Sequence, residues 1–128
     1  MQQGEKRKLL EKMLGRISEQ LVLVEGKNDA RALELAGIKP ACVIAVQSRR
    51  AASIASLAAE SGFAGVPVLL LFDFDPEGKR KAAEYEEILA ASGFAVDRQG
   101  RKAFRALFRL RTLEELPHAM QEVEKEIG

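Results

Sequence analysis

The sequence predicts an α/β fold of three layers, α/β/α, built on a mainly parallel sheet of about four strands. Short apolar runs without polar alternation recur along the chain, as in strands that are buried on both faces of a sheet. Segments with helical spacing of apolar residues separate these runs. Such alternation of strand and helix is typical of a parallel sheet covered by helices on both faces.

The elements follow from these patterns in chain order. Apolar residues at helical spacing predict an N-terminal helix within residues 1–18. The predicted strands are residues 21–24, 41–46, 66–72 and 94–97, and the predicted helices between them are residues 28–36, 49–60 and 76–91. Gly37 and Gly93 stand where a helix C-terminus favours glycine. Residues 101–110 predict a further helix, and the capping-box pattern that begins at Thr112 opens the last one.

Length and composition predict one cytoplasmic domain. A chain of 128 residues suits a single domain, here residues 1–128, with a core at about 19–97, the N-terminal helix at 1–18 and a C-terminal helical extension at 98–128. A single cysteine excludes an internal disulfide. No apolar stretch approaches the ~20 residues that span a bilayer, so no membrane partner is expected.

Acidic side chains stand at the ends of two predicted strands. Glu25 closes the first strand, and Asp73 and Asp75 close the third. The carboxyl ends of parallel strands form the binding edge of such a sheet, so the three carboxylates are expected at one edge. Mg²⁺, or Mn²⁺ in its place, binds to carboxylates, waters and substrate phosphate oxygens, so Glu25, Asp73 and Asp75 are its candidate ligands. Gly26 and Gly78 flank the acids, where glycine lets backbone approach a phosphate.

A purely structural interpretation of the same acids is open. Asp75 precedes Pro76, and this pair is typical of a helix start in which the aspartate caps the helix. On this interpretation Asp73 is a solvated strand end and Glu25 pairs with a lysine.

Two motifs resemble those of the Toprim family, the catalytic domain shared by topoisomerases, bacterial primases and several nucleases. Residues 22–29, Val-Leu-Val-Glu-Gly-Lys-Asn-Asp, are similar to its first motif, a strand followed by Glu-Gly and a later Asp. Residues 70–78, Leu-Leu-Phe-Asp-Phe-Asp-Pro-Glu-Gly, are similar to its second, Asp-x-Asp followed by Gly. The resemblance covers about residues 19–97 and implies the family's α/β fold.

The resemblance also implies roles for individual residues. Glu25 would be the general acid or base, and Asp73 and Asp75 would hold Mg²⁺. Lys27 and Asp29 are similar to residues of the maturation nucleases of the small ribosomal RNA. The only tyrosine, Tyr85, is predicted on a solvated helix face among glutamates, so it is not expected to serve as a topoisomerase nucleophile. The substrate-recognition modules of the well-known relatives have no counterpart in this sequence.

Basic residues are the expected contacts for nucleic acid. Arg49 and Arg50 follow the second predicted strand, on the edge where the acids lie. The C-terminal extension carries a basic stripe with no acid within it, namely Arg101, Lys102, Arg105 and Arg109. Such a stripe binds phosphates through counterion release. Alternatively, these basic residues form a solvated face or pair with acidic residues of the last predicted helix.

The function expected from these features is a Mg²⁺-dependent nuclease that acts on RNA or DNA, in RNA processing or DNA repair. One alternative is a non-catalytic module that binds nucleic acid or a protein partner. Another is a protein that binds or hydrolyses nucleotides at the same edge. The apolar terminal helices fit packing either on the chain's own sheet or on a second copy, and a larger complex would supply substrate recognition.

Overall fold

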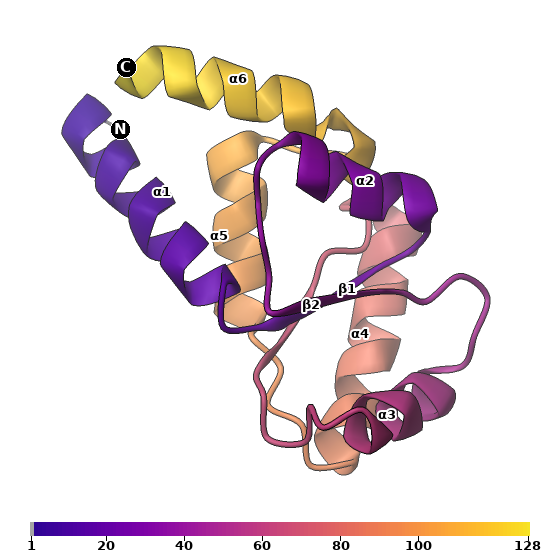
Figure 1. The fold of residues 1–128 in the computed structure, drawn as a ribbon. Coiled ribbons are helices and arrows are strands. Elements are labelled where there is room, and N and C mark those ends of the chain that lie inside the picture. Colours follow the sequence, from indigo (N-terminus) through magenta and orange to yellow (C-terminus); the bar gives the residue numbers. More distant parts are fainter. Residues whose placement is uncertain (1) are drawn as a thin grey trace.

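The computed structural model describes residues 2–128 as a small α/β fold whose parallel sheet is flanked by helices (Figure 1). The strands are β1 (Leu21–Val24), β2 (Cys42–Ala45) and β3 (Val68–Leu70). The helices are α1 (Gln3–Ile17), α2 (Lys27–Leu35), α3 (Ala51–Glu60), α4 (Pro76–Ala91), α5 (Arg98–Phe108) and α6 (Leu116–Ile127), with a 3₁₀ turn η1 (Leu113–Glu115) before α6. The predicted fold class is confirmed.

The sheet has the order β2-β1-β3, and both pairings are parallel. β1 therefore lies in the middle, and its end is adjacent to the end of β3. The register places Leu23 of β1 beside Leu70 of β3. This order brings the segment that begins at Glu25 next to the segment that begins at Leu71.

The two faces of the sheet are covered by different helices. Val22 and Val24 of β1 belong to a core that includes residues of α1, α2, α5 and α6. Leu21 and Leu23 point to the opposite face and pack with residues of α3 and α4. All four β1 residues are at most 1% exposed, which is why the run contains no polar residue. Figure 1 shows the two helical layers on either side of the strands, with the two termini near each other.

The sheet has three strands rather than the expected four. Residues 94–97 contribute one isolated bridge, between Val96 and Val68. Asp97 then caps α5, because its side chain accepts a hydrogen bond from Gly100 N at 2.8 Å. Since the helix begins at the next residue, the chain turns away before a second pair of strand residues can form.

The expected solvated position of Tyr85 on α4 is wrong. Tyr85 is 2% exposed rather than solvated, and its hydroxyl donates to the Arg49 carbonyl at 2.7 Å. Its ring packs edge-on against Phe72 at 5.0 Å between centroids. Pro117 lies in the first turn of α6, where proline is well tolerated, because the 3₁₀ turn precedes the α-helix. No helix in residues 2–128 is long and apolar enough to cross a membrane.

Candidate acidic site at the ends of strands β1 and β3

The three predicted acids line one pocket at the carboxyl edge of the sheet. Glu25, Asp73 and Asp75 share this acidic pocket of about 280 Å³ with Gly78 and Lys81 of α4. Adjacency of β1 and β3 brings them together from distant parts of the sequence. Within residues 2–128, no three His, Cys, Asp or Glu side chains are arranged as a ready-made metal-binding group. The three carboxylates line the same pocket, but their oxygens do not point to a common position.

Lys81 is the partner of Glu25 in this pocket and lies outside both motifs. Its ammonium pairs with Glu25 Oε2 and also donates to the Gln47 carbonyl at 3.2 Å. It lies 5.4 Å from the centroid of the Phe72 ring, within range of a cation–π interaction. The lysine partner foreseen in the structural interpretation of Glu25 is therefore present.

Asp73 is fixed by the segment that leads into α6. Its Oδ1 accepts a hydrogen bond from Leu113 N at 2.9 Å, at the start of the 3₁₀ turn η1. Asp73 is thus held by backbone and is not the freely solvated strand end of the structural interpretation. Its second oxygen makes no hydrogen bond within residues 2–128.

Asp75 caps α4, as its position before Pro76 predicted. Its Oδ1 accepts a hydrogen bond from Gly78 N at 2.8 Å. One carboxylate oxygen is used in this cap, which leaves the second oxygen for another partner. Capping and binding to an ion are therefore compatible at this residue.

Gly78 has a different role from the one expected. Its N–H is used by Asp75 and is not directed at a ligand. A Cβ built on Gly78 would overlap the carbonyl oxygen of Asp73 and come within 2.9 Å of its Cα. Glycine at this position lets the first turn of α4 pack directly on the Asp73 backbone. By contrast, a Cβ on Gly26 would meet no atom within 4 Å.

Asp29, the last residue of the first motif, is a buried acid with 9% of its surface exposed. Its Oδ2 accepts a hydrogen bond from Gly26 N at 3.1 Å, which caps the start of α2. Burial raises the pKa of Asp29, and the negative charges of Asp73, Glu114 and Glu25 raise it further, against the lowering effect of the Gly26 hydrogen bond. Neighbouring Lys27 is exposed and forms no ion pair within residues 2–128.

We expect Asp29→Asn to stabilise the protein at neutral pH. The raised pKa means that the folded state binds a proton more readily than the unfolded chain, so wild-type stability falls as pH rises from about 3.8 through the folded-state pKa. Asparagine retains an oxygen for Gly26 N without the charge. Thermal unfolding followed at several pH values should show a higher Tm for the variant at pH 7 and little difference near pH 3. A lower Tm at pH 7 would contradict this account of Asp29.

Arg101 holds the end of β3 and does not face solvent with the rest of the predicted stripe. Its guanidinium donates to the carbonyls of Leu70 at 3.0 Å, Phe72 at 2.7 Å and Asp73 at 2.8 Å. It also lies over the Phe74 ring, 4.4 Å from its centroid. Burial, aided by the charge of Arg105, lowers the pKa of Arg101 to about 10, so the group stays charged at neutral pH. Arg101 thereby positions the backbone that carries Asp73 and Asp75.

Arg101→Met should destabilise the protein by at least about 2 kcal/mol, because it removes the charged donor from three carbonyls at once. Urea denaturation measures the change. Arg105→Met, on the exposed side of the same helix, is the matched control and should stay within about 0.5 kcal/mol of wild type. Equal effects of the two substitutions would show that the contacts of Arg101 contribute little.

The other predicted basic residues are spread over three places. Lys102 and Arg105 are exposed on α5, whereas Arg109 ends that helix in a left-handed conformation beside acidic residues of α6. The four residues of the predicted stripe do not form one exposed face, because Arg101 turns inward and Arg109 lines another pocket. Arg49 folds back on its own loop, with its guanidinium on the Ala45 and Val46 carbonyls.

The loop after β2 lies beside the acidic pocket. Gln47 N donates to the Glu25 carbonyl at 2.7 Å, and Gln47 itself has a positive φ of 54°. A non-glycine residue in this region stores about 1–3 kcal/mol of strain. Lys81 and Tyr85 hold the loop through the carbonyls of Gln47 and Arg49. Arg50 is exposed at the N-cap of α3.

Comparison with known proteins places the chain beside one solved structure. No family model matches the chain, and no curated protein matches it. A protein from Aquifex aeolicus superposes with a TM-score of 0.69 and is 32% identical in sequence. The match covers 85% of this chain and 95% of the Aquifex chain. The chain therefore belongs to the same protein family as this Aquifex aeolicus protein.

Proposed function

We propose that the chain is a Toprim domain that acts as a Mg²⁺-dependent nuclease in the cytoplasm. The observation that carries the proposal is the shared pocket of Glu25, Asp73 and Asp75 at the ends of two adjacent strands. Each of the two Toprim-like motifs contributes acids to this pocket. RNA and DNA are both candidate substrates, and a second copy or a larger complex would supply selectivity.

The donor chemistry of the pocket fits a magnesium ion. Asp73 and Asp75 each use one oxygen for a backbone N–H and keep the other for a cation. Mg²⁺ is usually bound by one or two carboxylates together with waters and substrate phosphates, so a complete protein cage is not required. When bound, the ion would polarise the phosphate and neutralise charge that develops on it.

Residues of the protein itself would transfer the proton and position the carboxylates. Lys81 holds one oxygen of Glu25, which leaves Oε1 to take or give a proton at the bridging phosphate oxygen. Arg101 and Gly78 keep the Asp73 backbone against β3 and α4. These contacts orient the carboxylates before substrate arrives, which is how positioning lowers a barrier.

Lys81 and a metal ion would compete for Glu25, so Lys81→Met should tighten Mg²⁺ binding. Both side chains of the pair are partly exposed, at 26% for Lys81 and 45% for Glu25, and such ion pairs contribute at most about 1 kcal/mol. The expected gain is therefore no more than about fivefold in affinity. Calorimetric titration with Mg²⁺ measures it, with Lys79→Met as the control for loss of one nearby charge. Weaker binding by Lys81→Met alone would contradict the competition.

The test of the proposed function is cleavage of structured RNA, single-stranded DNA and supercoiled plasmid with Mg²⁺ or Mn²⁺. The control is the double variant Asp73→Ala/Asp75→Ala. Metal-dependent cleavage that the control abolishes supports a nuclease and identifies its substrate class. Absence of cleavage, with salt-sensitive binding retained in the control, would instead favour a non-catalytic binding module.

A further inference from the structure

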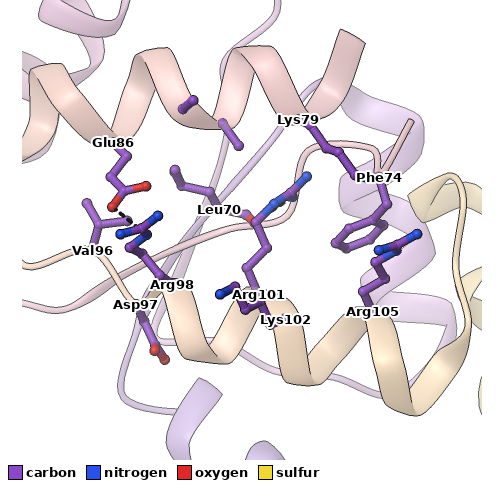
Figure 2. A pocket seen from close by; sticks show the side chains of 12 residues that line it. Leu70, Phe74, Lys79, Glu86, Val96, Asp97, Arg98, Arg101, Lys102 and Arg105 are labelled. Carbon is purple, nitrogen blue, oxygen red and sulfur yellow. Dashed lines mark hydrogen bonds and ion pairs between the residues drawn. The ribbon is translucent and has the colours of Figure 1, made fainter. Parts of the chain in front are cut away.

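A second cleft, distinct from the acidic pocket, lies between α4 and α5 (Figure 2). Its volume is about 360 Å³. Figure 2 shows Leu70 and Arg101 near its middle, with Lys79, Phe74 and Arg105 towards one end. Apolar side chains form part of the lining, namely Leu70, Phe74, Ala82, Ala83 and Val96.

The α4–α5 cleft carries an excess of positive charge. Glu86 is paired with Arg98 at 3.0 Å, and Asp97 is used as the cap of α5. The remaining lysine and arginine side chains at the rim are Lys79, Lys102 and Arg105, and none of the three forms an ion pair within residues 2–128. The charges that could attract an anion are therefore not neutralised by the cleft's own acids.

An apolar lining beneath cationic side chains fits a ligand with flat apolar faces and several negative charges. Single-stranded nucleic acid has both, because its bases are unstacked and its phosphates lie along one side. A double helix hides the faces of its bases, so it could use the cations of this cleft but not the apolar lining. The chemistry of the cleft therefore favours a single strand.

The α4–α5 cleft and the acidic pocket share no lining residue, but they border the first turn of α4 from different sides. Gly78 lines the acidic pocket, and Lys79 lines the cleft. Asp73 and Asp75 line the pocket, and the intervening Phe74 lines the cleft under Arg101. A strand with a phosphate at Asp73 and Asp75 would cross the first turn of α4 at Lys79 to reach the cleft.

We propose that the α4–α5 cleft binds single-stranded nucleic acid and leads it to the acidic pocket. The inference rests on the proposed function for the destination of the strand, while binding in the cleft can be measured separately. Lys79, Lys102 and Arg105 bind the phosphates, and the apolar lining accepts a base.

The test is fluorescence anisotropy with labelled oligouridylate and oligothymidylate and with a matched duplex. Binding is measured in EDTA, where no metal-dependent turnover occurs, so a failed cleavage assay and a failed binding assay are separate results. The charge variant is Lys102→Glu/Arg105→Glu. Its control is Lys8→Glu/Arg31→Glu, which makes the same change in net charge at exposed positions outside the cleft.

The charge variant should bind the single strand at least tenfold more weakly, while the control stays within twofold of wild type. Its plot of log affinity against log salt should become shallower by about 1.4, as expected for the loss of two phosphate contacts to a single strand. Equal effects of the two double variants would overturn the proposal, because they would trace binding to net charge rather than to the cleft.

A second pair of variants tests the apolar lining without changing charge. Ala83→Trp should fill the cleft and weaken single-strand binding, whereas Ala90→Trp, exposed on the same helix outside the cleft, should not. Ala83→Trp and Ala90→Trp should have equal effects on the affinity for the duplex. Unchanged single-strand binding by Ala83→Trp, or tighter binding of the duplex than of the single strand by wild type, would overturn the proposal. Full displacement of the strand by uridine monophosphate at equal concentration would also overturn it, in favour of a mononucleotide site.

Discussion

Gly78→Ala is expected to destabilise the protein by about 2 kcal/mol or more, because the added methyl group has no space. It would overlap the Asp73 carbonyl oxygen, which is backbone and cannot rotate away. Relief requires α4 to move off the end of β3, and this movement also displaces Asp75, the cap of that helix. Urea denaturation should show the loss of stability, and metal-dependent cleavage should fall with it.

Gly26→Ala is the matched control for this prediction. Gly26 is the N-cap residue of α2, shortly after β1, and has open space where a Cβ would lie. We expect a cost below about 1 kcal/mol, mainly from replacing a residue that is preferred at a helix N-cap. If Gly78→Ala were as mild as Gly26→Ala, the close approach of α4 to Asp73 would not be a determinant of the fold.

Glu25→Gln should lower the rate of cleavage by about 10²–10⁴-fold, the usual contribution of a general acid or base. The amide keeps the size and a hydrogen-bonding oxygen of Glu25 but cannot transfer the proton. Substrate binding should be retained, because the cations of the α4–α5 cleft are unchanged. Single-turnover cleavage and anisotropy on the same preparation separate the two effects.

Glu84→Gln, an exposed acid of α4 outside the acidic pocket, is the control for Glu25→Gln and should cleave at the wild-type rate. An equal, small effect of both substitutions would remove Glu25 from the chemistry. That result, together with retained binding, would favour the non-catalytic module over the enzyme.

The parts of the fold that the sequence predicts are those with a strong local pattern. The unbroken run at residues 21–24 predicts a strand buried on both faces, and its residues do divide between the two cores. Asp75 followed by Pro76 predicts the start of α4 to the residue. The predicted fourth strand does not form. Residues 94–97 have a strand-like composition, but the cap formed by Asp97 makes the chain turn after one bridge.

The site is less predictable because its contacts join residues far apart in the sequence. The strand ends predict that Glu25, Asp73 and Asp75 lie together, but nothing local pairs Glu25 with Lys81. Arg101, Arg105 and Arg109 recur every four residues, and this spacing predicted that all three lie on one exposed face of a helix. Arg101 also lies three residues before buried Phe104, on the inward face of α5, and this spacing was the signal that it turns inward. Tyr85, three residues after buried Ala82, carried the same signal on α4.

Binding of Mn²⁺, followed by electron paramagnetic resonance without nucleic acid, tests directly whether Asp73 and Asp75 hold a metal ion. Wild type is compared with Asp73→Asn/Asp75→Asn, and Glu122→Gln/Glu124→Gln on α6 controls for the loss of two acidic charges. The account predicts that wild type and the control bind Mn²⁺ with equal affinity, and that the aspartate variant loses the site. Undiminished binding by the aspartate variant would contradict the account, because the metal would then lie elsewhere.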